Sequence, residues 1–193
     1  MNIQKYTADT IRNNIVSVCN HATCTLPQRK AIKLIVCGLI ENGSTILNQL
    51  TREEEKATTK KQAEKLGKHL GNINLTESVN KVTLNKTVKY IGDDTVIGYD
   101  LTDIAKVSAK KMQGISEIFD GSKREKANGY TLHGVGTSDF LMRLDIHNQN
   151  KETLPQRRKQ IIEEITKKTK RKGIWTFDRG NDSGDFFRYL NQD

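Results

Sequence analysis

The sequence predicts an α/β protein in which a small all-helical domain precedes a domain built on a mixed sheet. Apolar residues recur at helical spacing up to about residue 71, and short runs rich in β-branched and aromatic residues take over from residue 95. Charge also divides the chain, because residues 1–90 hold 14 basic and 7 acidic side chains, whereas residues 91–193 hold 18 and 16. We therefore expect a helical domain over residues 1–75, a linker over 76–90 and a sheet domain over 91–193.

The basic surplus of the first half is typical of a domain that holds a polyanion. The whole chain of 193 residues carries a formal net charge of +9. No apolar run approaches the roughly 18 residues needed to cross a bilayer, and the N-terminus lacks the pattern of a secretory signal. These features predict a cytoplasmic protein with no membrane partner.

Three helices are expected in the first domain. The first covers residues 28–41 and is buried on most of its circumference, and the turn Asn42-Gly43-Ser44 ends it. Ser44 can cap a second, short helix with Ile46, Leu47 and Leu50 on one face. A third runs over residues 59–70.

The third helix is rich in lysine. Its cationic candidates for contacting DNA are Lys60, Lys61, Lys65 and Lys68. A helix, a tight turn, a short helix and a longer basic helix are compatible with a helix-turn-helix unit that lays cations along phosphate. A small helical bundle with a solvated basic face explains the same pattern equally well.

Cysteines offer a weaker candidate site in the same domain. Cys19, His21, Cys24 and Cys37 could supply four zinc ligands, but their spacing is not a standard one. Cys37 sits in an apolar run, where a small buried thiol is the ordinary explanation. Reduced thiols are therefore expected.

Strands are expected over residues 95–100, 130–135, 140–146 and 174–178. The second and third should form a hairpin. A polar excursion over residues 106–129, which contains the turn signal Asp120-Gly121-Ser122, separates them from the first. A charged helix that opens at Pro155 and carries a stripe of isoleucines precedes the fourth strand. The order strand, strand, strand, helix, strand is the layout of the ribonuclease H-like fold.

Asp100 and Asp178 end the first and fourth of these strands. In this layout the two strands are neighbours, so carboxylates 78 positions apart in sequence can share metal ions. Paired carboxylates suit magnesium or manganese, which keep waters and substrate phosphate as their other ligands. Two ions roughly 4 Å apart would catalyse in-line displacement at phosphorus.

Most aspartates at strand ends are turn formers or helix caps, and several compete for the first position. Asp93, Asp94 and Asp103 lie near Asp100, which we prefer because it ends the most convincing strand. Asp178 is followed by Arg179 and Gly180, which place a cation beside the carboxylate and let the chain turn sharply. Arg179 is therefore a further candidate for contacting DNA.

Two segments resemble the catalytic aspartate regions of DDE-type insertion-sequence transposases of the IS4-like kind. The first is Tyr99-Asp100-Leu101-Thr102-Asp103-Ile104-Ala105-Lys106, followed by Asp120-Gly121-Ser122 and Gly129-Tyr130; the second is Phe177-Asp178-Arg179-Gly180 with Asp182. The resemblance implies a transposase that cleaves insertion-sequence ends and joins them to target DNA. It implies Asp100 and Asp178 as catalytic metal ligands and two Mg²⁺ or Mn²⁺ ions in the complete enzyme. A homodimer on DNA fits this family, and the sequence leaves the oligomeric state open.

The sequence departs from the family beyond Asp178. Such enzymes need a third carboxylate, a glutamate on a later helix, and the 15 residues after Asp178 contain none. Glu163 and Glu164 come too early, before the fourth strand. We therefore expect an incomplete transposase whose own catalysis is uncertain. The alternatives are a non-catalytic DNA-binding remnant that competes with the full enzyme and, more distantly, an unrelated nuclease.

Overall fold

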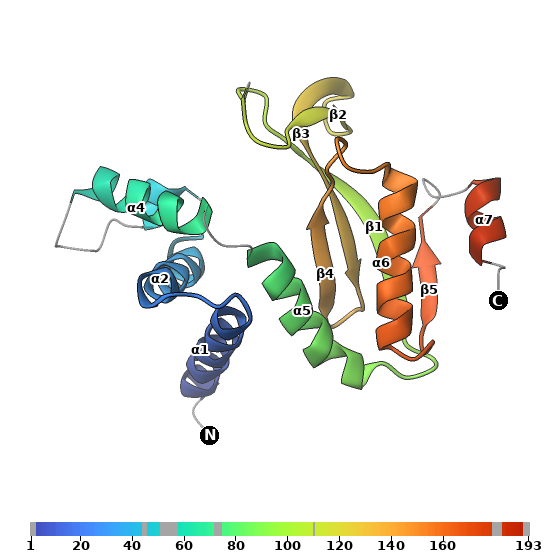
Figure 1. Ribbon diagram of the computed structural model, residues 1–193, viewed down its shortest axis with the longest axis horizontal. Coiled ribbons are helices and arrows are strands. Elements are labelled where there is room, and N and C mark those ends of the chain that lie inside the picture. The colour runs from blue at the N-terminus through green and yellow to red at the C-terminus, as the bar shows by residue number, and fades with distance from the viewer. Residues whose placement is uncertain are drawn as a thin grey trace. The chain divides into compact units, whose positions relative to one another are not determined.

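The computed structural model describes residues 3–43, 46–50, 58–71, 75–109, 111–178 and 183–190. The chain forms two compact units, Met1–Val82 and Thr83–Asp193. The first is helical and the second is mixed α/β (Figure 1). No helix in the described ranges has the length and apolar character needed to span a bilayer.

Among the described residues, and apart from the first part of α5, which is described below, the first unit contains the three helices expected from its sequence and one more before them. These helices are α1 (Ile3–His21), α2 (Leu26–Asn42), α3 (Leu47–Leu50) and α4 (Thr59–Gly71). Gly43 ends α2 in the left-handed conformation, with φ of 60°, and its N–H donates to the Leu39 carbonyl. This is the C-cap conformation that glycine adopts most readily, so the predicted stop after Asn42 is confirmed. Ser44, the predicted cap of the next helix, lies outside the described residues.

The segment 76–90, predicted as a linker, is helical. It forms most of α5 (Leu75–Thr87) and a 3-10 turn, η1 (Val88–Tyr90). Leu84 is 2 % exposed and belongs to the core of the second unit, against which Val88 also packs. This tertiary burial stabilises a helix whose many Asn and Thr residues give it low intrinsic propensity.

The second unit is built on a mixed sheet of five strands. These are β1 (Val96–Ala105), β2 (Ser116–Asp120), β3 (Glu125–Gly136), β4 (Leu141–Ile146) and β5 (Ile174–Phe177). The order is β2-β3-β1-β5, and β4 also pairs with β3. β3 is antiparallel to β1, β2 and β4, whereas β5 runs parallel to β1.

Two strand predictions need correction. β1 does not end at Asp100 but continues to Ala105, because residues 101–105 pair with the first half of β3. The polar excursion 106–129 contains β2, which forms a hairpin with β3 around the Asp120-Gly121-Ser122 turn. Asp120 stabilises this turn by accepting hydrogen bonds from the Ser122 and Lys123 backbone N–H groups. The predicted turn was therefore right, whereas β2 and the first half of β3, which flank it, were missed.

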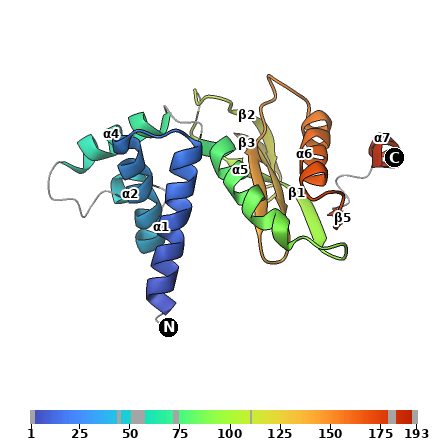
Figure 2. The same cartoon turned by 60° about the horizontal axis from the view of Figure 1, so that its bottom comes forward.

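One face of the sheet carries the core of the second unit. Ile97, Tyr99 and Val135 point to this face and pack with Ile161 and Ile165 of α6 (Leu154–Lys168). In both views α6 runs beside the sheet (Figures 1 and 2). Because side chains alternate along a strand, the residues between these point to the opposite face. Large apolar side chains on that face, including Leu144, Ile146 and Ile174, are exposed.

Candidate functional site

Asp100 of β1 and Asp178, directly after β5, line the same surface of the second unit. β1 and β5 are parallel and in register through the pair Tyr99↔Phe177, the residues directly before the two aspartates. Neighbouring strands are about 4.8 Å apart. Both aspartates line one open hollow of about 490 Å³. The structure therefore brings together the two carboxylates singled out in the sequence.

The strands hold these carboxylates in different ways. Asp100 is in the middle of β1, where Gly134 of β3 pairs with it on one side and β5 lies on the other. The predicted strand-end position of Asp100 is thus wrong, whereas Asp178 does follow the last residue of β5. Phe177 contacts Tyr99 at a ring-centroid distance of 5.9 Å and Phe186 at 4.9 Å. These contacts fix the strand end that precedes Asp178.

None of the competing aspartates shares this arrangement. Asp93 and Asp94 lie in the turn before β1. Asp103 alternates onto the face opposite Asp100, and its Oδ1 accepts a hydrogen bond of 2.5 Å from Thr131. The glutamates on α6 are also on the covered side, since Glu164 Oε2 accepts a 2.7 Å hydrogen bond from the buried Arg143.

Glycines form part of the sheet surface beside the two carboxylates. Gly98 and Gly136 line the hollow with Gly134, and a Cβ built on Gly134 would meet only the Asp100 carbonyl oxygen, at 3.8 Å. A glycine inside a strand often marks a place where another backbone or a ligand approaches closely. Both carboxylates are exposed. An anionic group with its counter-ions could therefore reach them from solvent.

The donor set fits a hard divalent cation only in part. Two carboxylates are enough for Mg²⁺, which keeps several waters. The Oδ1 atom of Asp100 already accepts a hydrogen bond from the Leu101 N–H at 2.8 Å. Within the ranges that the structure describes, no group of three or more His, Cys, Asp or Glu side chains could hold a metal ion. The third carboxylate that the resemblance implies does not accompany this pair there.

A chain of buried polar side chains lies beneath the site on the covered face of the sheet, and no sequence pattern predicted it. The Tyr99 hydroxyl is 2.7 Å from His133 Nδ1, and His133 Nε2 is 3.2 Å from His147 Nδ1. Burial lowers the pKa of His133 to about 4, and it also lowers the pKa of His147. Both imidazoles are therefore neutral near pH 7 and serve as hydrogen-bond partners inside the core.

The lysines predicted to contact DNA are exposed on α4 of the first unit. Lys61 and Lys65 line a groove of about 630 Å³ between α2 and α4, together with Lys30 and His69. Lys60 and Lys68 are not among the residues that line it. Sequence reasoning missed Lys30, although its place on the exposed side of an otherwise apolar helix was a usable signal. Arg179 lies outside the described residues.

The cysteines form part of the core of the first unit. Cys19 and Cys24 are buried and cluster with Ile32, and burial raises the pKa of the Cys19 thiol. His21 is exposed, and Cys37 lies on α2. The arrangement of Cys19 and Cys24 is that of small buried thiols packed against apolar neighbours.

No protein family matches the chain, and no curated protein matches it. The geometry defines a mixed α/β unit with two level carboxylates on one open sheet face, joined to a basic helical unit.

Proposed function

We propose that this chain supplies two metal-binding carboxylates, Asp100 and Asp178, of a DNA strand-transfer enzyme of the transposase kind. The observation that carries the proposal is their level position on adjacent parallel strands, in one hollow. The segments around both residues resemble insertion-sequence transposases. This resemblance is the reason for proposing strand transfer as the reaction and DNA as the substrate.

The strand order supports a ribonuclease H-like arrangement. β1, β3 and β4 form an antiparallel succession, α6 follows, and β5 returns parallel to β1. In this arrangement the central strand carries the first carboxylate, and its parallel neighbour carries the second. β1 is paired on both sides, so it places the Asp100 side chain more rigidly than a loop would, as catalysis by oriented groups requires.

The chain's own residues would bind and orient the reacting groups. Asp100 and Asp178 would hold Mg²⁺ or Mn²⁺, and the bare surface at Gly134 leaves room for a phosphodiester beside them. Bound divalent ions activate the attacking oxygen and stabilise the leaving oxygen at phosphorus. Lysines of the first unit supply the charge that keeps the DNA backbone on the protein.

A metal-binding experiment tests the site before any chemistry is assayed. Mn²⁺ bound to the full chain would be counted by electron paramagnetic resonance for wild type, Asp100→Asn and Asp178→Asn. Asp103→Asn is the matched control, because it removes a carboxylate from the same strand but from the opposite face. We expect the first two variants to lose Mn²⁺ and the control to keep it. Equal binding by all four proteins would rule out this site.

Strand nicking then separates two functions of the same lineage. Supercoiled plasmid carrying insertion-sequence ends is incubated with Mg²⁺ or Mn²⁺, and wild type is compared with Asp178→Asn. Nicking by wild type alone supports catalysis by this chain. Metal-dependent binding without nicking favours the second candidate, a non-catalytic DNA-binding competitor. The observation behind that candidate is that no third carboxylate joins the pair among the described side chains.

A further inference from the structure

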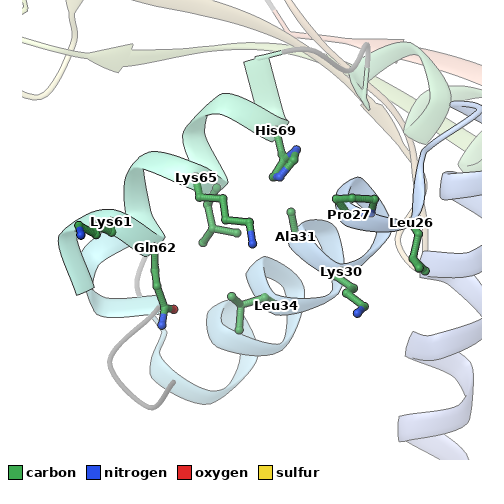
Figure 3. Close-up of a pocket in the computed structure, with 10 residues that line it drawn as sticks. Leu26, Pro27, Lys30, Ala31, Leu34, Lys61, Gln62, Lys65 and His69 are labelled. Atoms are coloured by element: carbon green, nitrogen blue, oxygen red, sulfur yellow. The ribbon is translucent and has the colours of Figure 1, made fainter. Parts of the chain in front are cut away.

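The groove between α2 and α4 has cations on both walls. Lys30 stands on α2, and Lys61, Lys65 and His69 stand on α4. Figure 3 shows Lys65 and His69 extending from α4 toward the side of α2 that carries Ala31. Among the described residues, no aspartate or glutamate lines the groove. The described lining therefore carries a net positive charge.

The basic side chains that α4 contributes form a regularly spaced row. Lys61 and Lys65 are four residues apart, which is one helical turn or about 6 Å along the axis, and the imidazole of His69 follows at the same interval. Like charges one turn apart destabilise a helix by a few tenths of a kcal/mol. Lys30, Lys61 and Lys65 make no salt bridge within the described part of the chain. Such a row is typical of a surface whose counter-charge comes from a ligand.

We propose that the phosphates of one DNA backbone lie in this groove, held by Lys30 from α2 and by Lys61 and Lys65 from α4. The row suits a polymer with evenly repeated charges, since successive lysines can meet successive phosphates. The inference rests on the proposed function for its choice of DNA as the polyanion. The inference adds to that function the three lysines that hold the phosphates and the course of the DNA backbone along the groove.

A docking acidic protein helix is the alternative occupant. Such a helix needs exposed apolar surface to bury along its length. Ala31 and Leu66 line the groove but are 5 % and 4 % exposed, whereas Leu26, at the start of α2, is 66 % exposed. The groove therefore combines its lysines with some uncovered apolar surface, and the competition experiment below distinguishes the two occupants.

A helix that reads bases in the major groove of DNA would instead use the exposed side of α4 alone. That side carries Lys60 and Lys68 as well as Lys61 and Lys65. In that arrangement all four lysines would contribute to binding. Lys60 and Lys68 do not line the groove, so they serve as matched controls on the same helix.

The test measures affinity for a fluorescent duplex by anisotropy over a salt series. Each phosphate contact contributes about 0.9 to the slope of log K against log salt concentration. Lys30→Ala, Lys61→Ala and Lys65→Ala should each lower the slope by about that amount, whereas Lys60→Ala and Lys68→Ala should leave it unchanged. The proposal would be overturned if the groove variants and the control variants lowered the salt slope equally. It would also be overturned if only Lys60→Ala and Lys68→Ala lowered the slope. Far-UV circular dichroism verifies that each variant keeps its helices.

Two further measurements separate DNA binding in the groove from metal binding at the aspartates and from binding of an acidic protein. The salt series is run in EDTA without divalent ions, so that the metal site does not contribute to the slope and failure of the metal site is distinguishable from failure of the groove. Poly-glutamate at equal charge concentration should displace the duplex much less than unlabelled DNA does. If it competes equally well and the groove variants abolish that competition, an acidic protein is the ligand and the DNA proposal is wrong.

Discussion

At the level of single residues, the proposed metal site predicts a cost in stability at Asp100. Its carboxylate is level with that of Asp178 on the neighbouring strand, and like charges facing each other across a sheet are destabilising. Asp100→Asn keeps the shape and the acceptor for the Leu101 N–H. Without divalent ions, we expect this variant to gain a few tenths of a kcal/mol in unfolding free energy. Urea unfolding followed by the fluorescence of the only tryptophan, Trp175, measures it.

In the presence of Mg²⁺, we expect the opposite ranking of unfolding free energies, with wild type more stable than Asp100→Asn. A ligand that binds only the folded state stabilises it by mass action, so wild type gains and Asp100→Asn does not. Asp103→Asn should respond to Mg²⁺ as wild type does, because its side chain lies on the other face. An identical Mg²⁺ response in wild type and Asp100→Asn would contradict the assignment.

The buried His133 makes the second unit sensitive to acid. Its pKa is lowered from the usual 6.5 to about 4, chiefly by burial and then by His147. The unfolded chain therefore binds more protons than the folded one between these values, and stability falls as pH drops from about 6.5 to about 4. The full effect is on the order of 3 kcal/mol.

His133→Gln isolates this contribution. The amide keeps a hydrogen-bonding group near Tyr99 but does not titrate. The unfolding free energy of the variant, read from Trp175 fluorescence in urea, should fall less steeply than that of wild type over the same pH window. Parallel pH profiles for the two proteins would show that His133 is not the titrating group.

Sequence reasoning did well for single residues where a local rule decided the outcome. The turns at Gly43 and Asp120 follow from glycine conformation and from side-chain to backbone hydrogen bonds, which need only nearby residues. Asp100 was chosen for a strand end that does not exist, because pairing with β3 extends β1. Lys30 joins Lys61 only through the packing of α2 on α4, which no local pattern encodes.

Among the elements, α6 is the one that defines the covered face of the sheet, and its first turn is capped. The Thr153 side chain accepts a hydrogen bond from the Gln156 N–H, and Gln156 Oε1 accepts one from the Thr153 N–H at 2.9 Å. Thr153→Ala removes the capping oxygen and should cost about 1 kcal/mol of unfolding free energy. Thr153→Ser keeps it and should stay near wild type. Equal losses for Ala and Ser would mean that the methyl group, rather than the cap, matters.

Elements with a strong periodic pattern were predictable, and elements held by tertiary contacts were not. The isoleucine stripe of α6 gives its length and its buried face directly from sequence. α5 lacks such a stripe, and its placement depends on burial of Leu84 against the sheet. β2 is short, and Ile118 gains its burial by packing where Gly129 of β3 has no side chain. These are long-range effects that a local reading does not contain.

For the whole molecule, the two compact units have separate cores, and we expect them to unfold separately. Cys19, Cys24 and Ile32 cluster in the first, and Ile97, Tyr99 and Ile165 cluster in the second. The continuous helix α5 belongs to both, but Leu75 packs against the first cluster and Leu84 is part of the second. A substitution of a residue that belongs to one core alone should therefore destabilise that core without changing the packing of the other.

Matched truncations test this independence. Leu66→Ala removes a side chain that is 4 % exposed in the first unit, and Ile165→Ala one that is fully buried in the second. Each should lower the stability of its own unit by roughly 2–5 kcal/mol. Trp175 reports on the second unit alone, so Leu66→Ala should shift the urea transition seen by circular dichroism but leave the fluorescence transition in place. Ile165→Ala should shift the fluorescence transition. A fluorescence shift caused by Leu66→Ala would show that the units unfold as one, because a cavity in one core can then destabilise the other.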